Sequence, residues 1–310
     1  MPTRRSVLAA VAAAPLALPS VSSANQMSPA SSVRFCLNTS TIREQKLSVP
    51  EQVALCGVAG YDGIEPWIRD LRGFVDGGGD VKELRSRLDD AGVRVESAIG
   101  FAKWIVDDEA ERKAGLEELR RDMQLVAALG GEAIAAPPIG AHRGAAKIDN
   151  DTIAERYAAA LAIGREENVA PQLEVWGFSD NLSKLADVLY VATAVGDELA
   201  CVLPDIYHLY RGGNDFASVR MLPGTAVRCF HINDISSSIA AANANDSDRV
   251  YPGLGEMPIV EVLQHMKASG FAGALSLELF NPDYWKLPAE RVAREGLERM
   301  RSVAREAGLV

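Results

Sequence analysis

The chain has 310 residues, of which 48% are hydrophobic and 24% charged, and its formal net charge is −10. This acidic balance argues against a nucleic-acid partner, because proteins that bind phosphate backbones neutralise them with clustered Lys and Arg. The four cysteines lack the close CxxC spacing of structural zinc and redox sites, so we assign them no function.

Residues 1–24 have the features of a twin-arginine export signal. Arg4-Arg5 precede an alanine-rich apolar run, and Ser22-Ser23-Ala24 offers small residues for cleavage. The apolar run is shorter than the roughly 20 residues that span a bilayer, so we expect no stable membrane insertion. We therefore expect the protein to be exported to the periplasm or the extracellular space.

Residues 25–32 have the composition of a linker, and residues 33–310 run without a further low-complexity break. This part of the chain is long for one domain. β/α barrels reach such a length with a single core. We expect a single domain over residues 33–310.

Short apolar runs alternate with longer amphipathic ones, as in parallel strands joined by crossover helices. The strands are expected at residues 33–38, 63–67, 93–99, 133–136, 170–176, 200–205, 226–233 and 274–279. The helices between them include residues 109–129, 151–168 and 288–307. The pattern predicts eight strand and helix pairs.

Glycines at the expected helix ends support this division, among them Gly92, Gly130 and Gly270. The main competitor is an open doubly wound sheet, which carries a glycine-rich phosphate-binding turn after its first strand. Here that turn reads Asn38-Thr39-Ser40-Thr41. We therefore predict the α/β class and an eight-stranded β/α (TIM) barrel.

Four ligand-type residues, Glu174, Asp205, His231 and Glu278, lie late in strands five to eight. A barrel gathers such positions at its C-terminal face, and buried charges are costly unless they are paired or bind a metal. The alternative is that a nearby Lys or Arg satisfies each residue separately. We predict one divalent metal, Mn²⁺ first, with Mg²⁺, Co²⁺ or Zn²⁺ also compatible.

The same residues resemble the metal motifs of the xylose-isomerase-like superfamily, in particular its sugar phosphate isomerase/epimerase-like proteins. The motifs are Glu174, Asp205-Ile206-Tyr207-His208, His231-Ile232-Asn233-Asp234 and Leu277-Glu278. The resemblance implies that Glu174 and Glu278 are both ligands and the acid/base pair, and that His208 contacts a substrate oxygen. It also implies a small-molecule carbohydrate substrate and suggests dimers or tetramers.

The reaction implied by the resemblance is isomerisation or epimerisation through an enediolate, in which a carboxylate takes the proton beside a metal-bound carbonyl. The chain departs from the ketose epimerases at two places. Ser237 stands where they carry an arginine, and Asn233-Asp234 replaces their Lys-Asp. These departures affect the expected epimerase reaction and leave the metal ligands intact.

Further candidates for substrate binding lie near the ends of the second and third strands. Glu65 is adjacent to Trp67, whose ring could stack on a sugar, and Glu96 lies at the end of the third strand. Either glutamate could instead form a salt bridge at the barrel rim.

Loop residues at the expected mouth of the barrel add three candidates for substrate contact: His142, Arg249 and Trp285. A solvated histidine and a packed tryptophan are the alternatives for His142 and Trp285.

Three other classes of function remain open. An exported protein without an obvious basic phosphate cradle could be a metal-dependent lyase or hydrolase acting on an oxidised (3-oxo) glycoside. A non-catalytic carbohydrate-binding barrel would have no reason to keep four convergent ligands. An endonuclease-like phosphodiesterase would need more than the four histidines present.

Overall fold

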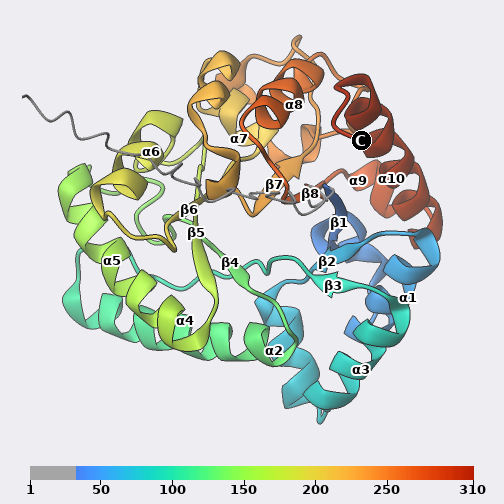
Figure 1. Cartoon of the computed structure of the whole chain (residues 1–310), viewed down its shortest axis with the longest axis horizontal. Coiled ribbons are helices and arrows are strands. Elements are labelled where there is room, and N and C mark those ends of the chain that lie inside the picture. Colours follow the sequence, from blue (N-terminus) through green and yellow to red (C-terminus); the bar gives the residue numbers. More distant parts are fainter. Residues whose placement is uncertain (1–32) are drawn as a thin grey trace, which may run out of the picture. The chain divides into compact units, whose positions relative to one another are not determined.

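Eight short strands lie at the centre of the structure, a computed structural model that describes residues 33–310 (Figure 1). They are β1 (Arg34–Asn38), β2 (Gly63–Glu65), β3 (Arg94–Val95), β4 (Ala133–Ala136), β5 (Ala170–Glu174), β6 (Cys201–Leu203), β7 (Cys229–Ile232) and β8 (Ala274–Leu277). The expected signal and linker, at residues 1–24 and 25–32, lie outside the described residues.

The strands pair in parallel and close into a barrel. Two ladders, β3-β2-β1-β8-β7 and β4-β5-β6, contain all eight strands. Ala135 N donates to Ala98 O at 2.8 Å, which joins β4 to the segment after β3. His231 N donates to Pro204 O at 2.9 Å, which joins β7 to the end of β6. These bonds close the ring, and the predicted TIM barrel is confirmed.

Helices surround the strands (Figure 1). They are α1 (Val49–Ala59), α2 (Ile68–Asp76), α3 (Val81–Ala91), α4 (Glu109–Ala128), α5 (Asn150–Glu167), α6 (Leu185–Ala194), α7 (Ile206–Arg211), α8 (Ile259–Ala268), α9 (Pro282–Trp285) and α10 (Ala289–Glu306). The three helices given bounds from the sequence, now α4, α5 and α10, begin and end within one residue of the prediction. No helix of residues 33–310 combines the length and apolar character needed to cross a membrane.

Local sequence signals explain where the long helices begin and end. The Asp108 side chain accepts from Glu111 N at 2.7 Å to cap α4, and Asp149 accepts from Thr152 N at 2.9 Å to cap α5. Gly92 after α3 has φ +65°, a left-handed conformation that glycine adopts without strain. Helix ends were therefore readable from caps and glycines.

Strand ends were less readable. Residues 93–99 were expected to form one strand, but regular pairing stops at Val95. It returns only as a single bridge between Trp67 and Ile99. Apolar character continues past the point where the backbone leaves the ladder, and a hydrophobic pattern alone does not mark that point.

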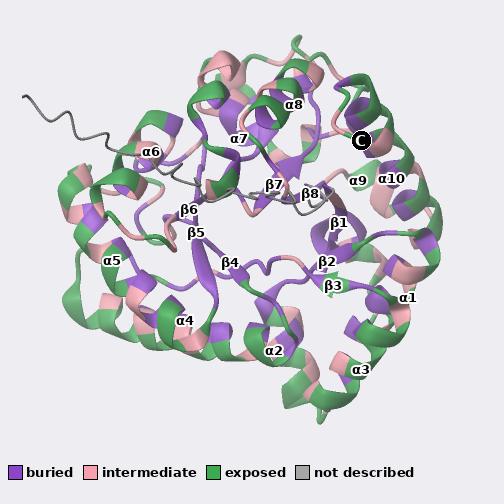
Figure 2. Cartoon of the chain, viewed as in Figure 1, coloured by how far each residue is buried: buried purple, intermediate pink, exposed green. Residues whose placement is uncertain are grey.

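The core has two layers. The strands are buried almost throughout, whereas the outward faces of the helices are exposed (Figure 2). The larger layer packs between strands and helices. A smaller cluster fills the barrel interior and consists of Cys36, Trp67, Ile99, Ala135, Leu203, Cys229 and Ala274. A filled interior leaves the ends of the barrel as the places for chemistry.

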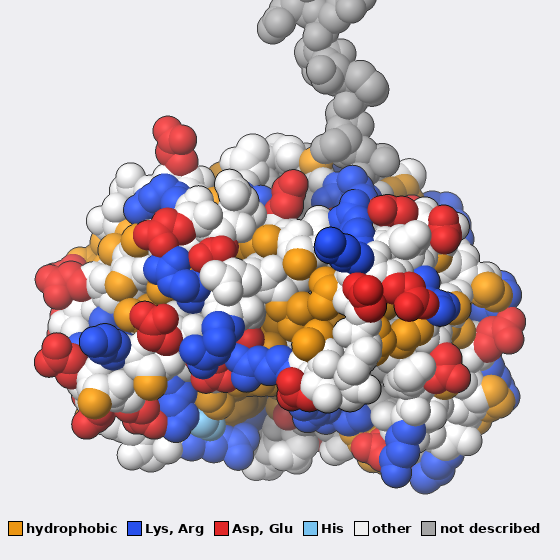
Figure 3. Space-filling view, turned by 90° about the horizontal axis from the view of Figure 1, so that it is seen from below, with side chains coloured by type: hydrophobic (Ala, Val, Ile, Leu, Met, Phe, Trp, Pro, Cys, Tyr) orange, Lys and Arg blue, Asp and Glu red, His pale blue; other side chains and the backbone are white. Residues whose placement is uncertain are grey.

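The surface mixes both signs of charge. On the face shown in Figure 3, acidic and basic side chains are interspersed, with apolar side chains between them. The net charge of −10 is therefore not gathered into one acidic band on that face.

Candidate active site

Ligand-type side chains stand at the C-terminal ends of β5 to β8. Glu174 is the last residue of β5 and His231 lies within β7, while Asp205 and Glu278 directly follow the ends of β6 and β8. All four are buried, with exposed fractions of 4% or less. Parallel closure of the strands brings these positions to one end of the barrel.

Asp205, His231 and Glu278 form one cluster. His231 Nδ1 lies 3.5 Å from Asp205 Oδ2 and 3.2 Å from Glu278 Oε2. One ligand atom from each residue lies within 4.8 Å of the other two. Glu174 falls outside this group of three but lines the same cavity as Glu278. The structure thus brings three of the four predicted ligands within reach of one ion and places the fourth, Glu174, on the wall of the cavity.

The donor set fits a divalent metal. Both ring nitrogens of His231 are buried and face carboxylate oxygens at 3.0 to 3.5 Å, without meeting the geometry of a hydrogen bond in the described part of the chain. Buried polar atoms in native proteins almost always have a hydrogen-bond partner, so an Nδ1 that faces two carboxylates without one is suited to bind a metal. Carboxylate oxygens and an imidazole nitrogen are donors that Mn²⁺, Co²⁺ and Zn²⁺ accept.

Electrostatics separate the four residues. Burial, together with the charge of Glu278, raises the pKa of Glu174 to about 8, against the opposing influence of His231. Burial would also raise the pKa of Asp205, but Arg249, His208 and His231 hold it well below its ordinary value. Two carboxyl groups in one site therefore differ in protonation near neutral pH.

Arg249 lies among these carboxylates. Its Nη1 donates to Asp205 Oδ2 at 3.1 Å and to Glu278 Oε2 at 2.6 Å, and its Nη2 donates to Asp246 Oδ1 at 2.5 Å. The side chain is 1% exposed and its guanidinium lies 4.1 Å from the centre of the Tyr207 ring. Arg249 is thus the buried cation that balances Asp205 and Glu278 in the metal-free chain.

His208 lies on α7, and its side chain is next to that of Arg249. Asp205 caps this helix by accepting from His208 N at 3.1 Å, so one aspartate both starts the helix and faces the cluster. Burial lowers the pKa of His208 to about 4, and the ring is neutral at pH 7. Its Nε2 lies 3.5 Å from Arg249 Nη2. A neutral imidazole lining the cavity can donate or accept a hydrogen bond.

A cavity of about 170 Å³ opens over the cluster. Its polar lining comes from Glu174, His208, Asp246, Arg249 and Glu278, and its apolar lining from Trp67, Ile99, Phe101, Trp176, Phe178 and Phe280. Convergent charged groups within an aromatic wall are typical of a small-molecule site. The predicted substrate contacts Trp67, His208 and Arg249 all line it.

Glu65 is not among the residues that line this cavity, and its expected role as a substrate contact stays a prediction. It is fully buried and lies deeper in the barrel, where Oε2 accepts from Asn38 Nδ2 at 2.9 Å and from Ser276 Oγ at 2.7 Å. The side chain extends from the end of β2 into the barrel, where it contacts residues of β1, β7 and β8.

Two loop candidates also lie outside the cavity. His142 is half-buried and packs edge-on against Trp176, with ring centres 5.4 Å apart, so it supports the cavity wall from behind. Trp285 donates from Nε1 to Ser40 O at 3.0 Å and holds α9 against the segment after β1. Substrate contact by His142 and Trp285 therefore stays a prediction, since neither residue lines the cavity in this structure.

Glu96 lies at the opposite end of the barrel. Its Oε1 is 2.7 Å from Arg34 Nε and 3.6 Å from Arg94 Nε, and both arginines are at the starts of strands. The salt-bridge alternative is therefore the correct one for Glu96.

Sequence reasoning missed two polar residues of the site. Asn38 donates through Nδ2 to Glu65 Oε2 at 2.9 Å and to Glu278 Oε1 at 3.1 Å. It is the last residue of β1, and the strand-end rule that selected Glu174 would also have selected it. Asp246 lies in a polar stretch whose spacing gave no signal; it lines the cavity and accepts a hydrogen bond from Arg249 Nη2.

The family match covers most of the chain. The family described as xylose isomerase-like TIM barrel matches residues 53–303. The chain belongs to this family. An inosose isomerase of Bacillus velezensis is 24% identical over 87% of this chain and 97% of its own length. A 3-dehydroshikimate dehydratase of Pseudomonas putida is 28% identical over 82% of this chain, but the match spans only 39% of that longer protein.

Solved structures of the family show the same barrel. The structure described as the IOLI protein with a binding zinc atom has a TM-score of 0.81 and 21% identity, covering 88% of this chain and 99% of that one. A D-psicose 3-epimerase solved in the presence of D-fructose has a TM-score of 0.72 and 17% identity, covering 89% and 100%. At these identities the likeness establishes the fold.

Proposed function

We propose that this family member is a divalent-metal-dependent enzyme that removes a proton next to the carbonyl of a sugar- or polyol-derived ketone and isomerises or epimerises it. The observation that carries the proposal is Glu174. It is a buried carboxyl group that lines one small cavity together with Glu278. Two carboxyl groups that face the same cavity can take a proton from a substrate and return it.

The residues that line the cavity have different proposed roles. Glu174 and Glu278 are the proposed acid/base pair, each holding or releasing a proton at a carboxylate oxygen. His208, neutral because burial lowers its pKa to about 4, offers a hydrogen bond to a substrate oxygen. The aromatic wall formed by Trp67, Trp176 and its neighbours excludes water and provides flat apolar faces for a ring or chain of carbons.

Asp205, His231 and Glu278, completed by Glu174, are the proposed ligands of the metal, which we propose is Mn²⁺, with Zn²⁺ as the main alternative. The zinc atom in the IOLI protein supports a divalent ion in this fold. When bound, the ion would supply a Lewis acid that stabilises negative charge on oxygen.

A dehydratase or other lyase is the second candidate. The 3-dehydroshikimate dehydratase of Pseudomonas putida is 28% identical to this chain, and dehydration also begins with a proton next to a carbonyl. The same base would serve, and the outcome would depend on whether the neighbouring carbon carries a leaving group, such as the hydroxyl of a polyol or the aglycone of a 3-oxo glycoside.

One experiment separates these candidates. The metal-loaded full chain is incubated in deuterium oxide with an inosose, a set of ketoses, 3-dehydroshikimate and a 3-oxo glycoside, and products are followed by NMR. Deuterium on carbon without fragmentation supports the isomerase or epimerase, whereas water or aglycone loss supports the lyase. Absence of exchange and of product with every substrate, in a sample shown to contain metal, would contradict the proposal.

Export remains a separate proposal. It rests on Arg4-Arg5 and the apolar run that follows them. Replacing both arginines by lysine should retain the full-length chain in the cytoplasm of a host with a twin-arginine system, as measured by cell fractionation. An unchanged distribution would refute it.

A further inference from the structure

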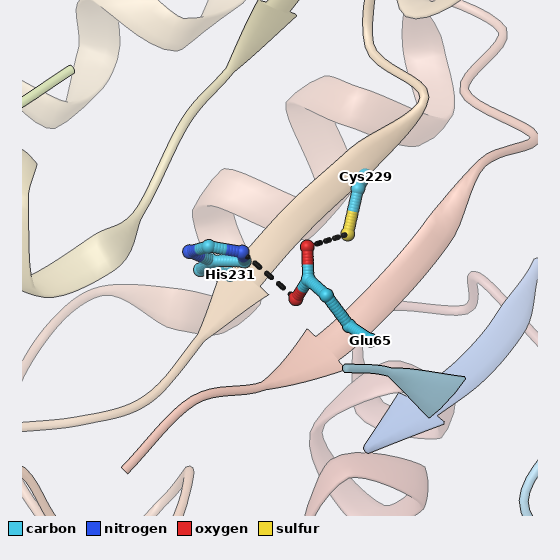
Figure 4. A group of neighbouring side chains, drawn as sticks. All are labelled: Glu65, Cys229 and His231. Carbon is cyan, nitrogen blue, oxygen red and sulfur yellow. Dashed lines mark hydrogen bonds and ion pairs between the residues drawn. The ribbon is translucent and has the colours of Figure 1, made fainter. Parts of the chain in front are cut away.

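Glu65 lies beside one ring nitrogen of His231 (Figure 4). Glu65 Oε2 lies 3.0 Å from His231 Nε2, while His231 Nδ1 faces Asp205 and Glu278 at 3.5 and 3.2 Å. The imidazole therefore lies between carboxylates on both sides. All of these side chains are buried, so water does not screen the charges.

Glu65 is fixed in this place by neutral donors. Its Oε2 accepts from Asn38 Nδ2 and Ser276 Oγ, and Cys229 Sγ lies 3.8 Å from its Oε1 (Figure 4). The strands β1, β7 and β8 thus each contribute one contact. A carboxylate held from three sides cannot swing into the cavity, which it does not line.

Asn38 connects this buried carboxylate to the mouth of the site. Its amide also donates to Glu278 Oε1 at 3.1 Å, and its Oδ1 accepts from Trp67 Nε1 at 3.0 Å. Asn38 therefore orients Glu65, Glu278 and the Trp67 wall together. The Asn38 amide has its donor group and its acceptor oxygen both hydrogen-bonded. Through Glu65 it also links the position of His231 to that of Glu278.

We propose that Glu65 is a positioning residue for the metal site, holding His231 so that Nδ1 is presented next to Asp205 and Glu278. The inference rests on the proposed function, since it assumes that the cluster binds a divalent ion. An imidazole that gives one nitrogen to a cation gains positive charge on its ring. A carboxylate at the far nitrogen stabilises that charge, and losing such a partner typically lowers metal affinity about 10- to 100-fold.

Glu65, Cys229 and His231 could alternatively hold an ion of their own, because one ligand atom from each lies within 4.8 Å of the others. Two observations favour positioning. Glu65 Oε2 already accepts two hydrogen bonds. His231 is needed by the cluster on its other side.

The test is a metal titration of the metal-depleted full chain with Mn²⁺ and with Zn²⁺, comparing wild type with Glu65→Gln. The amide keeps the size of the side chain and removes its charge. We expect one ion per chain in both proteins and an affinity about 10- to 100-fold weaker in Glu65→Gln. The matched control is Glu96→Gln, a buried carboxylate at the other end of the barrel, which should leave metal affinity unchanged.

A second readout separates positioning from general stability. With Co²⁺ in the site, the visible absorption spectrum of Glu65→Gln should differ from that of wild type. Thermal unfolding of the Glu96→Gln control, without metal, measures how much stability is lost when a carboxylate charge is removed elsewhere in the barrel. If Glu65→Gln does not fold, Ser276→Ala removes one bond to Glu65 and should weaken metal binding in the same direction, by less.

The outcomes are distinct. Equal affinities and spectra for wild type and Glu65→Gln, or for Ser276→Ala if only that variant folds, would overturn the positioning role and leave the proposed function standing. Two ions per wild-type chain, falling to one in Glu65→Gln, would overturn it in favour of a second metal site. A wild-type chain that binds neither ion would contradict the proposed function itself.

Discussion

The two ends of the barrel both carry buried charge, but they are built differently. At the N-terminal end a cavity of about 380 Å³ is lined by Arg34, Arg94, Glu96 and Glu132, among others. Glu96 there lies between two arginines, one of which is 66% exposed. At the C-terminal end the cavity is smaller, about 170 Å³, and its charged lining residues Glu174, Arg249 and Glu278 are buried, whereas Asp246 is partly exposed.

The difference lies in the balance of charge. At the C-terminal end Asp205 and Glu278 share one buried cation, Arg249. They also face His231, whose pKa burial would lower but which Glu278 and Glu65 raise well above its ordinary value. At the N-terminal end a carboxylate has more than one cation. The larger cavity is therefore not the better candidate for the active site. The better candidate is the end of the barrel where buried carboxylates outnumber buried cations.

The largest expected effect at the C-terminal end is on catalysis. Replacing Glu174 by Gln removes the proposed base while keeping its shape, and should lower kcat about 100- to 10,000-fold, the usual contribution of general acid–base catalysis. The measurement is turnover of whichever substrate exchanges deuterium, with circular dichroism as the control for folding. Full activity in Glu174→Gln would show that the proton is taken elsewhere.

The next effect is on stability. Arg249→Met leaves Asp205 and Glu278 without their buried partner, and should lower the free energy of unfolding of the metal-free chain by about 3–5 kcal/mol. Added Mn²⁺ or Zn²⁺ should then stabilise the variant more than it stabilises wild type, because the ion compensates the same carboxylates. Urea unfolding with and without metal measures both quantities. Equal metal increments would mean that Arg249 and the ion do not share these carboxylates.

A smaller and graded effect is expected from pH. Glu174, with a pKa of about 8, and His231, with a raised pKa, are both protonated near neutral pH in the metal-free chain. A metal needs them deprotonated, so affinity should fall as pH falls below about 8, by about tenfold per pH unit for each proton displaced. Titration calorimetry in buffers of different ionisation enthalpy counts those protons. Affinity that is flat with pH would contradict the ligand assignment of Glu174.

The smallest effect is expected at the N-terminal end. Arg34→Gln breaks the 2.7 Å ion pair with Glu96, but Arg94 remains beside that carboxylate. The change should cost about 1 kcal/mol or less in stability and should not alter metal affinity. A large loss of metal binding in Arg34→Gln would show that the two ends are coupled through the barrel.

The sequence predicted the features that follow from periodic patterns, and it missed the positions that depend on individual tertiary contacts. Alternating strands and helices, glycine stops and the depth of Glu174, Asp205, His231 and Glu278 in their strands all follow from periodicity. The buried place of Glu65 does not follow, because strand position says which face a side chain takes but not how far below the mouth it lies.

Asn38 and Asp246 show the same limit in another form. Asn38 acts through partners that lie 27 and 240 residues further along the chain. Asp246 and Arg249 are hydrogen-bonded to each other, and a polar and alanine-rich stretch places both at the cavity. Ser237 was noted as a missing arginine, yet Arg249 brings a guanidinium to the cluster from a more distant position, which pairwise spacing could not reveal.

The bond between Asn38 and Glu278 also has a meaning for the order of assembly. It joins the first strand of the barrel to the last, and β1 and β8 pair directly. During synthesis the N-terminal strands emerge first, and β8 follows only near the end of the chain. Because Glu278 directly follows β8, the ligand cluster cannot be complete on a chain that ends before β8. Metal uptake would thus report that the ring of strands has closed.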